Sequence, residues 1–175
     1  MKKKYGFLLA GMILLVLFLT AAVLPGDLTP YGQKQMFDAW LPISGEHFLG
    51  TNALGYDIYT ELVYGAGDTL FVGLFSSILT MAIGVVIGVA SSSKGLIGGL
   101  FSGVINVFML LPRLISLIVL AAFLGQSRGT LVLLIALFGW AGTARTVRAR
   151  VQYISGQPYI QAARVSGYSR LHTAV

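Results

Sequence analysis

The sequence predicts an all-α fold, namely a polytopic membrane helix bundle in which about four transmembrane helices are present. Hydrophobic residues make up 56% of the 175 residues and charged residues only 10%, a composition outside the usual range of soluble domains. All six acidic residues lie between residues 27 and 68, and of the twelve basic residues only Lys34 lies there. A membrane sorts charge in this way, because lysine and arginine are retained on its cytoplasmic side.

The net charge of +6 is attributed to this topology, and no nucleic-acid partner is predicted. The chain has no basic surface interleaved with aromatic residues that would point to nucleic acid. It contains no cysteine, which excludes a disulfide framework, a thiolate metal site and a cysteine nucleophile.

The first membrane helix is predicted over residues 5–24. This segment follows a positively charged start, contains no charge and is long enough to cross a bilayer. Pro25 and Gly26 then break the helix. A cleaved signal peptide is the alternative, because residues 20–22 are small enough for processing. The length of the apolar segment and the hydrophobic chain downstream favour an uncleaved helix.

An acidic extracytoplasmic loop is predicted after the first helix, over residues 25–68. The first helix and this loop together form a first region, residues 1–68. The following uncharged segment, residues 69–91, is the second predicted span and returns to a polar, basic turn. Gly84 and Gly88 on this span have the spacing that lets another helix backbone approach closely. The alternative is a chance spacing in a chain with 22 glycines.

The third and fourth predicted spans belong to a second region, residues 69–175. The third covers residues 99–124 and is kinked at Pro112, because proline removes a backbone hydrogen bond. The fourth covers residues 130–147 and leads inward to a basic cluster. The N-terminus and the basic clusters are then all cytoplasmic.

Arg113 is the one charged side chain deep in an apolar stretch. An unpaired charge at that depth is costly, so Arg113 is expected to face a cavity, a partner or the interface, and it is the candidate pathway residue. The alternative is that the span begins later and the side chain extends to the cytoplasmic headgroups. The sequence leaves both alternatives open.

Two motifs are separated by three apolar spans. Residues 47–57 read HFLGTNALGYD, and residues 159–169 read YIQAARVSGYS. Together they resemble the inner-membrane permease subunits of ATP-binding-cassette (ABC) importers, in the MetI-like transmembrane family. The most similar group is the peptide and nickel importers, whose second permease carries H-x-L-G-T-D-x-L-G-R-D after its first span. The later motif resembles the family's cytoplasmic E-A-A-x-x-x-G loop.

The first motif matches the family's extracytoplasmic segment at six positions. These are His47, Gly50, Thr51, Leu54, Gly55 and Asp57. Asn52 stands where the family usually has Asp, and Tyr56 where it usually has Arg. A hydrogen bond within the loop is the expected role of His47, with a cation contact as the alternative. No metal site is predicted, because the other histidine, His172, lies in the other compartment.

The second motif is the candidate ATPase-coupling element, within a cytoplasmic loop near residues 151–170. Pro158 suits the first turn of a short helix, and a glycine after the helix permits a left-handed turn that ends it. The resemblance implies that this helix docks into a cleft on an ATPase. The residues concerned are Gln161, Ala162, Ala163, Arg164 and Gly167, with Gln161 in place of the family's Glu. A helix lying on lipid headgroups is the alternative.

The resemblance implies a transport subunit and not an enzyme. The chain has no G-x-x-x-x-G-K-[ST] phosphate loop, so ATP and Mg are expected on a separate ATPase and no cofactor on this chain. The predicted spans contain no acidic residue, which argues against proton or sodium coupling through carboxylates. The expected cargo is peptides, nickel or a metal chelate. The expected partners are a second, homologous permease, two ABC ATPase subunits or domains, an extracytoplasmic substrate-binding protein and membrane lipid.

The resemblance also implies a multi-pass protein of a bacterial-type inner membrane. Family members follow a six-helix pattern and continue through about two more spans after the second motif, so the chain is expected to be truncated at its C-terminus. The competing function is a non-transport membrane adaptor whose basic cytoplasmic loop recruits a partner. Substrate-dependent uptake distinguishes the two functions.

Overall fold

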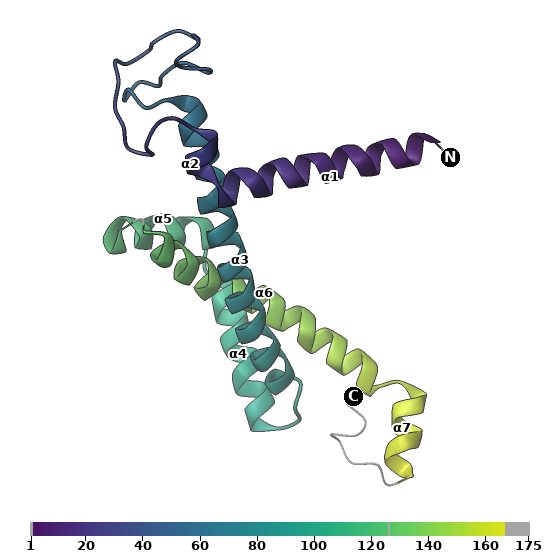
Figure 1. Ribbon diagram of the computed structural model, residues 1–175. Coiled ribbons are helices and arrows are strands. Elements are labelled where there is room, and N and C mark those ends of the chain that lie inside the picture. Colours follow the sequence, from purple (N-terminus) through teal and green to yellow (C-terminus); the bar gives the residue numbers. More distant parts are fainter. Residues whose placement is uncertain (1, 126, 167–175) are drawn as a thin grey trace. The chain divides into compact units, whose positions relative to one another are not determined.

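The protein is built almost entirely from helices, as Figure 1 shows. The structure is a computed structural model and describes residues 2–125 and 127–166. About 74% of the described part of the chain is helical, and none of the described residues belongs to a strand. The helices are α1 (Lys2–Val23), α2 (Pro25–Leu28), α3 (Ile58–Ser91), α4 (Leu96–Leu110), α5 (Arg113–Leu124), α6 (Arg128–Ser155) and α7 (Pro158–Val165). The prediction of an all-α fold is confirmed.

The number of possible membrane spans agrees with the prediction of about four. Among the described residues, α1, α3 and α6 are long and apolar enough to cross a bilayer, and α4 with α5 makes a fourth if this bent pair is one span. The chain forms two compact units, Met1–Gly73 and Leu74–Val175. The boundary between these units falls inside α3.

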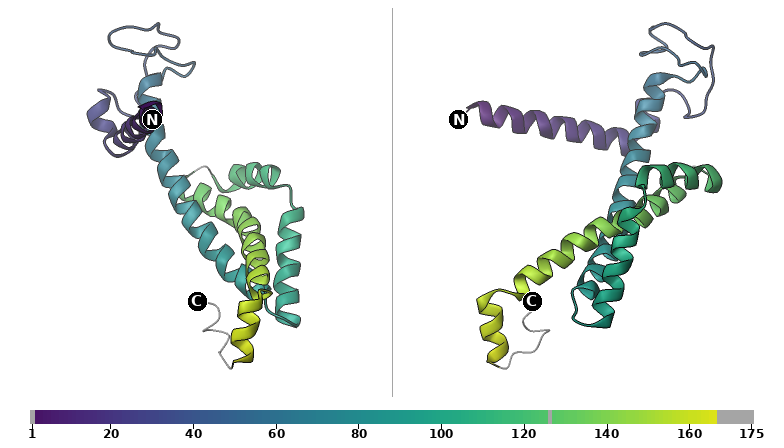
Figure 2. Two further views of the ribbon diagram at one scale, coloured as in Figure 1. Left: turned by 90° about the vertical axis from the view of Figure 1, so that its right-hand side faces the viewer. Right: turned by 180° about the vertical axis from the view of Figure 1, so that it is seen from behind.

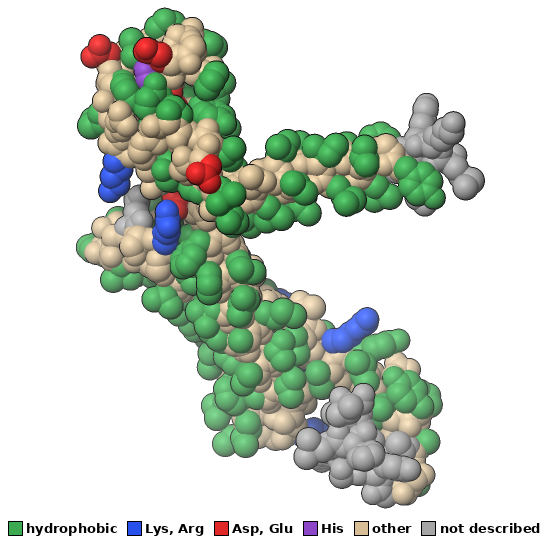
Figure 3. Space-filling view, viewed as in Figure 1, with side chains coloured by type: hydrophobic (Ala, Val, Ile, Leu, Met, Phe, Trp, Pro, Cys, Tyr) green, Lys and Arg blue, Asp and Glu red, His purple; other side chains and the backbone are tan. Residues whose placement is uncertain are grey.

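In the first unit, α1 is apolar on all sides from Tyr5 to its end at Val23. Its leucine and phenylalanine side chains are exposed, and Figure 3 shows hydrophobic side chains along most of its visible surface. A helix that is hydrophobic all round is typical of a membrane span. The end of α1 lies close to α3 at Gly67, because a Cβ atom added to this glycine would lie 3.0 Å from the carbonyl oxygen of Ala22.

Helix α3 begins well before the predicted second span, at Ile58 instead of residue 69. Its 34 residues extend for about 51 Å, which exceeds the bilayer core of about 30 Å. Hydropathy marks the part of a helix that lies in the membrane but not the residue at which the helix begins. Asp57 sets that start, because its backbone carbonyl accepts from Glu61 and its carboxylate accepts from the N–H of Thr60.

The predicted kinked span over residues 99–124 is in fact two helices. Helix α4 ends at Leu110, α5 begins at Arg113, and their axes differ by 80°. The two residues between them, Leu111 and Pro112, have extended backbone. A proline disfavours the helical conformation of the residue before it and has no N–H to donate. The helix therefore stops at Pro112 and does not merely bend there.

Helices α4 and α6 form the core of the second unit. Ile105 of α4 is buried against Trp140, Ala141 and Ala144 of α6. The ring of Phe108 meets the Trp140 ring edge-on, with the centroids 4.9 Å apart, which is a favoured aromatic geometry. The small alanines leave space for the bulky side chains of α4.

Helix α6 also packs against α3, as the left view of Figure 2 shows, and glycines set the distance. A Cβ atom on Gly84 would lie 2.6 Å from Cβ of Thr143. A Cβ atom on Gly88 would lie 2.7 Å from Cβ of Val147 and 2.8 Å from the carbonyl oxygen of Ala144. The Gly84–Gly88 spacing is therefore a packing contact and not a chance spacing.

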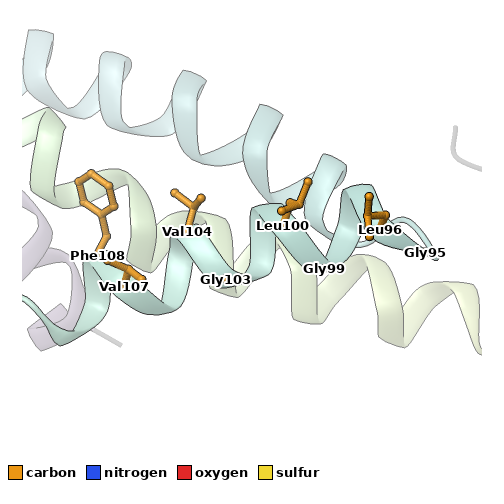
Figure 4. Close-up of a pocket in the computed structure, with 8 residues that line it drawn as sticks. All are labelled: Gly95, Leu96, Gly99, Leu100, Gly103, Val104, Val107 and Phe108. Carbon is orange, nitrogen blue, oxygen red and sulfur yellow. The ribbon is translucent and has the colours of Figure 1, made fainter.

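Glycines take the place of large side chains along one face of α4, beginning at Gly95 just before the helix. Gly95, Gly99 and Gly103 recur at every fourth position, and a Cβ atom on any of them would meet no described atom within 4 Å. They lie along an open apolar groove of about 750 Å³ (Figure 4). The other lining residues are Leu96, Leu100, Val104, Val107 and Phe108. Small residues at this spacing leave room for a neighbouring helix backbone.

Candidate functional site

The candidate coupling motif lies on α7, which follows α6 after a sharp corner. The N–H of Gly156 donates to carbonyl oxygens of the last turn of α6. The carbonyl oxygen of Gln157 accepts from the N–H groups of Ile160 and Gln161, each at 3.1 Å, and so closes the first turn of α7. Pro158 is the first residue of this helix, where the missing N–H of proline costs nothing. The predicted short helix is present.

Gln161 holds the corner between α6 and α7. Its Nε2 donates to the backbone carbonyl oxygen of Gly156 at 3.1 Å. Ile160 of α7 is buried, with 9% of its surface exposed. An ionised glutamate at residue 161, as in the family's motif, has no N–H to donate to that carbonyl. The departure from the motif therefore has a local structural use in this chain.

The outward face of α7 is apolar and open. Tyr159 is 62% exposed, Val165 is 91% exposed, and the small Ala162 is exposed between them. A short helix with an exposed apolar face and a small residue at its centre can fit closely into a groove. Ala163 and Arg164 also lie within α7.

Gly167 lies outside the described residues. The left-handed turn at this glycine therefore stays a prediction.

The first motif builds a buried His–Asp pair in the α2–α3 loop, residues 29–57. Nδ1 of His47 lies 2.9 Å from Oδ2 of Asp57, and the two residues are 5% and 3% exposed. The rings of Phe37 and Tyr31 pack against the imidazole, with centroid distances of 4.6 Å and 5.4 Å. The expected hydrogen bond of His47 within the loop is confirmed.

Thr51 links two segments of this loop. Its hydroxyl donates to the carbonyl oxygen of Asp38 at 2.6 Å and accepts from the N–H of Leu41 at 2.8 Å. Its own N–H donates to the carbonyl oxygen of Leu41 at 3.1 Å. Thr51 is only 3% exposed, and its buried hydroxyl both donates and accepts a hydrogen bond.

The two motif glycines have left-handed backbone. Gly50 has φ +73° and Gly55 has φ +79°, and a Cβ atom on either would collide with a backbone carbonyl oxygen, of Leu41 and Phe37 respectively. Side chains are strained at positive φ, and there is no space for one. Glycine is therefore required at both positions.

Asn52 and Leu54 differ from the rest of the motif. Oδ1 of Asn52 accepts from the N–H groups of Leu54 and Tyr56, and its Nδ2 donates to a carboxylate oxygen of Glu61 at 2.8 Å. An aspartate, which the family usually has here, cannot make the last bond. Leu54 is 67% exposed, whereas the other five matched residues are buried. Those five residues shape the loop, and Leu54 is available for contact.

The pKa of Asp57 is lowered below the ordinary value of 3.8. Burial raises this pKa, but hydrogen bonds from the backbone of Thr60 and from His47 outweigh burial by stabilising the carboxylate. A carboxyl group with a lowered pKa stabilises the fold above its unfolded pKa, and that contribution is lost as the pH falls through the folded pKa. The carboxylate of Asp57 therefore stabilises the loop fully at neutral pH.

We expect the hydrogen-exchange protection factor of the Thr51 amide to stay constant from pH 7 to pH 5, because Asp57 is ionised throughout this range. The protection should be lost as the pH falls below 3.8, the ordinary carboxyl value. In Asp57→Asn, which has no carboxyl group to titrate, the same profile should be flat in the acidic range. An acid transition of equal size in the variant would assign the pH dependence to another group.

Arg113 is exposed at the first residue of α5. It lies at the opposite end of α4 from Lys94, and the 15 residues of α4 extend for about 22 Å. The whole of α4 therefore separates Arg113 from Lys94. A pathway role of Arg113 stays a prediction.

A comparison with known families identifies the chain. Residues 62–175 match the family described as "Binding-protein-dependent transport system inner membrane component". The chain belongs to this family. The matched residues include the second motif and the helices α4 to α7, whereas the first motif lies before them.

Several bacterial permeases are similar over most of this chain. The dipeptide transport system permease protein DppC of Bacillus subtilis (strain 168) is 33% identical over 168 residues, which are 94% of this chain and 52% of that protein. The oligopeptide permease OppC of the same strain is 28% identical over 165 residues, 91% and 53% of the two chains. A putative peptide transport system permease of Brucella suis biovar 1 (strain 1330) is 29% identical over 164 residues, 92% and 55% of the two chains. The chain spans about half the length of these curated relatives.

Proposed function

We propose that this chain acts as a transmembrane permease subunit of an ATP-driven ABC importer and forms part of the pathway for peptides. Family membership carries this proposal, and the helices long enough to cross a membrane support it. Peptides are favoured over nickel or a metal chelate, because the names of all three relatives refer to dipeptide, oligopeptide or peptide transport.

The proposed orientation has the N-terminus in the cytoplasm of a bacterial-type inner membrane. The α2–α3 loop then faces the extracytoplasmic substrate-binding protein, and α7 faces the cytoplasm. A second, homologous permease completes the pathway, and two ABC ATPase subunits or domains bind ATP and Mg. The orientation rests on the sorting of charge along the sequence, whereas the partners are those that the family resemblance implies.

We infer that α7 is the coupling helix. Three features support this role: the fixed corner at Gly156, the exposed apolar face between Tyr159 and Val165, and the small residue Ala162 at its centre. A fixed corner transmits force because α7 cannot rotate freely relative to α6. A small central residue lets a partner groove approach the helix backbone.

Ala162→Glu is expected to abolish peptide uptake while leaving the chain folded in the membrane. The new carboxylate stands on an exposed face, so it costs the free chain little, but burying it in a partner groove without a partner charge costs several kcal/mol, on the order of 3–5. The measurement is uptake of a labelled dipeptide in cells that lack the chromosomal gene, together with co-purification of the ATPase.

Gln152→Glu is the matched control, because it adds the same charge to an exposed position at the end of the neighbouring α6. This control should retain uptake and ATPase association. If both variants transport dipeptide like the wild type, α7 is not the coupling helix. If deleting the gene leaves dipeptide uptake intact, the importer function itself is wrong and the adaptor function is favoured.

A further inference from the structure

The arginines at the inner end of α6 have no acidic side chain near them in sequence. After Asp68 the chain contains no Asp or Glu, yet Arg145, Arg148 and Arg150 lie within two turns of α6. Their charges cannot be neutralised by any acidic side chain of residues 69–175. A negatively charged group that pairs with these arginines would therefore come from outside residues 69–175.

These arginines lie on different faces of α6. The guanidinium group of Arg148 is half-buried and donates to the hydroxyl of Ser102 on α4. Arg145 and Arg150 are exposed and lie along an open groove of about 690 Å³. The remaining lining residues of this groove are Thr146, Ala149 and Tyr153.

The groove lies over the small side chain of Ala149, between the charged side chains of Arg145 and Arg150. Ala149 leaves the space, because Arg145 lies one turn before it and Tyr153 one turn after it on the same helix face. Nη1 of Arg145 contacts the sulfur of Met109 at 3.5 Å, and the guanidinium carbon of Arg150 lies 6.0 Å from the centroid of the Tyr153 ring. Neither contact supplies a negative charge.

In the proposed orientation, the length of α6 brings the groove to the level of the cytoplasmic lipid headgroups. Counted from Arg128, the first residue of α6, Arg145 lies about 26 Å and Arg150 about 33 Å along the helix. The hydrocarbon core is about 30 Å thick. With Arg128 placed at its outer boundary, as the proposed orientation implies, the two arginines fall on either side of its inner boundary. The packing of Gly88 against Ala144 agrees, because α3 ends only a few residues later at a polar turn. A tyrosine at this level is typical of a membrane interface.

We propose that this groove, lined by Arg145, Arg150 and Tyr153, binds the phosphate of an anionic phospholipid in the cytoplasmic leaflet. The inference rests on the orientation given in the proposed function. Guanidinium groups donate paired hydrogen bonds that match phosphate oxygens, and basic pockets on the cytoplasmic side of membrane helices suit lipid headgroups. The lipid then supplies the negative charge that residues 69–175 lack.

Native mass spectrometry of the purified chain, titrated with phosphatidylglycerol or phosphatidylcholine, tests this site. The wild type should retain phosphatidylglycerol preferentially. The double variant Arg145→Gln/Arg150→Gln should weaken phosphatidylglycerol binding about 25-fold, at about fivefold for each arginine near the membrane surface. Phosphatidylcholine binding should not change. Arg145→Lys/Arg150→Lys, which keeps the charge, should recover most of the loss.

Arg148→Gln is the matched control, because it removes one positive charge from the same helix segment but from the face that bonds Ser102. Its phosphatidylglycerol binding should stay within about twofold of the wild type, well below the fivefold effect of a surface arginine. Equal binding of phosphatidylglycerol by the wild type and the double glutamine variant would overturn the site. So would an equal loss in Arg148→Gln, or displacement of the lipid by inorganic phosphate at similar concentration. A wild type that binds the lipid but supports no peptide uptake would contradict the importer function and leave the lipid site in place.

Discussion

Replacing Gly88 with leucine is expected to push α3 away from α6 and to destabilise the second unit. A Cβ atom at residue 88 would lie 2.8 Å from the carbonyl oxygen of Ala144 and 2.7 Å from Cβ of Val147. Neither a backbone atom nor the Cβ of a β-branched residue can move aside as the end of a flexible side chain can. Overpacking a filled contact costs about 1–3 kcal/mol, and a wider separation also loses the dispersion contacts of closely packed helices. The purified chain should therefore unfold at a lower SDS concentration, as measured by far-UV circular dichroism.

Gly142→Leu provides the control for Gly88→Leu. Gly142 lies on α6, and a Cβ atom on this residue would meet no described atom within 4 Å. Leucine has a higher helix propensity than glycine by about 1 kcal/mol, so this variant should be as stable as the wild type or slightly more stable. If Gly88→Leu matched Gly142→Leu, the close α3–α6 contact would be absent from the protein in detergent.

The order and approximate position of the spans could be predicted from hydropathy and charge. The helix ends could not. Helix α3 extends outward to Ile58 because Asp57 caps it, and a capping carboxylate in a polar loop has no hydropathy signal. At Pro112 the sequence identified the position of the break but not its angle of 80°. That angle depends on the packing of α4 and α5 against α6.

The candidate site could be predicted in part. The motif at residues 47–57 indicated a hydrogen bond for His47, and Pro158 indicated the start of α7. The partner of His47 could not be chosen from the sequence, because Asp57 is one of several acidic residues in the same segment. The bond from Gln161 to Gly156 could not be predicted either, because it depends on how the chain turns between two helices.

The contact between Arg148 and Ser102 had no sequence signal at all. These residues are 46 positions apart and meet only because α4 and α6 pack side by side. The open face of Arg145 and Arg150 follows from the same packing. Sequence periodicity alone gives the faces of a helix but not which face a neighbour covers.

Asp57→Ala is expected to open the α2–α3 loop. The substitution removes the partner of His47 Nδ1 and the acceptor for the N–H of Thr60. A buried histidine left without a partner costs about 1–3 kcal/mol if neutral and about 3–5 kcal/mol if charged. Loss of the helix cap costs about 1 kcal/mol more. These losses fall on a segment whose described residues form no regular secondary structure, so limited proteolysis should cleave between residues 29 and 57 much faster than in the wild type.

Two further variants distinguish the loss of the His47–Asp57 contact from the mere loss of a negative charge in the loop. Asp38→Ala removes an exposed carboxylate from the same loop and should change stability by no more than about 0.5 kcal/mol, as for other surface positions. Asp57→Asn keeps a good capping side chain but loses the carboxylate beside His47, so its cleavage rate should be intermediate. Equal cleavage rates for Asp57→Ala and Asp38→Ala would mean that the His47–Asp57 pair does not hold the loop. The double variant His47→Ala/Asp57→Ala should be cleaved no faster than Asp57→Ala alone. That result would mean that the two side chains act as one unit, as their 2.9 Å contact requires.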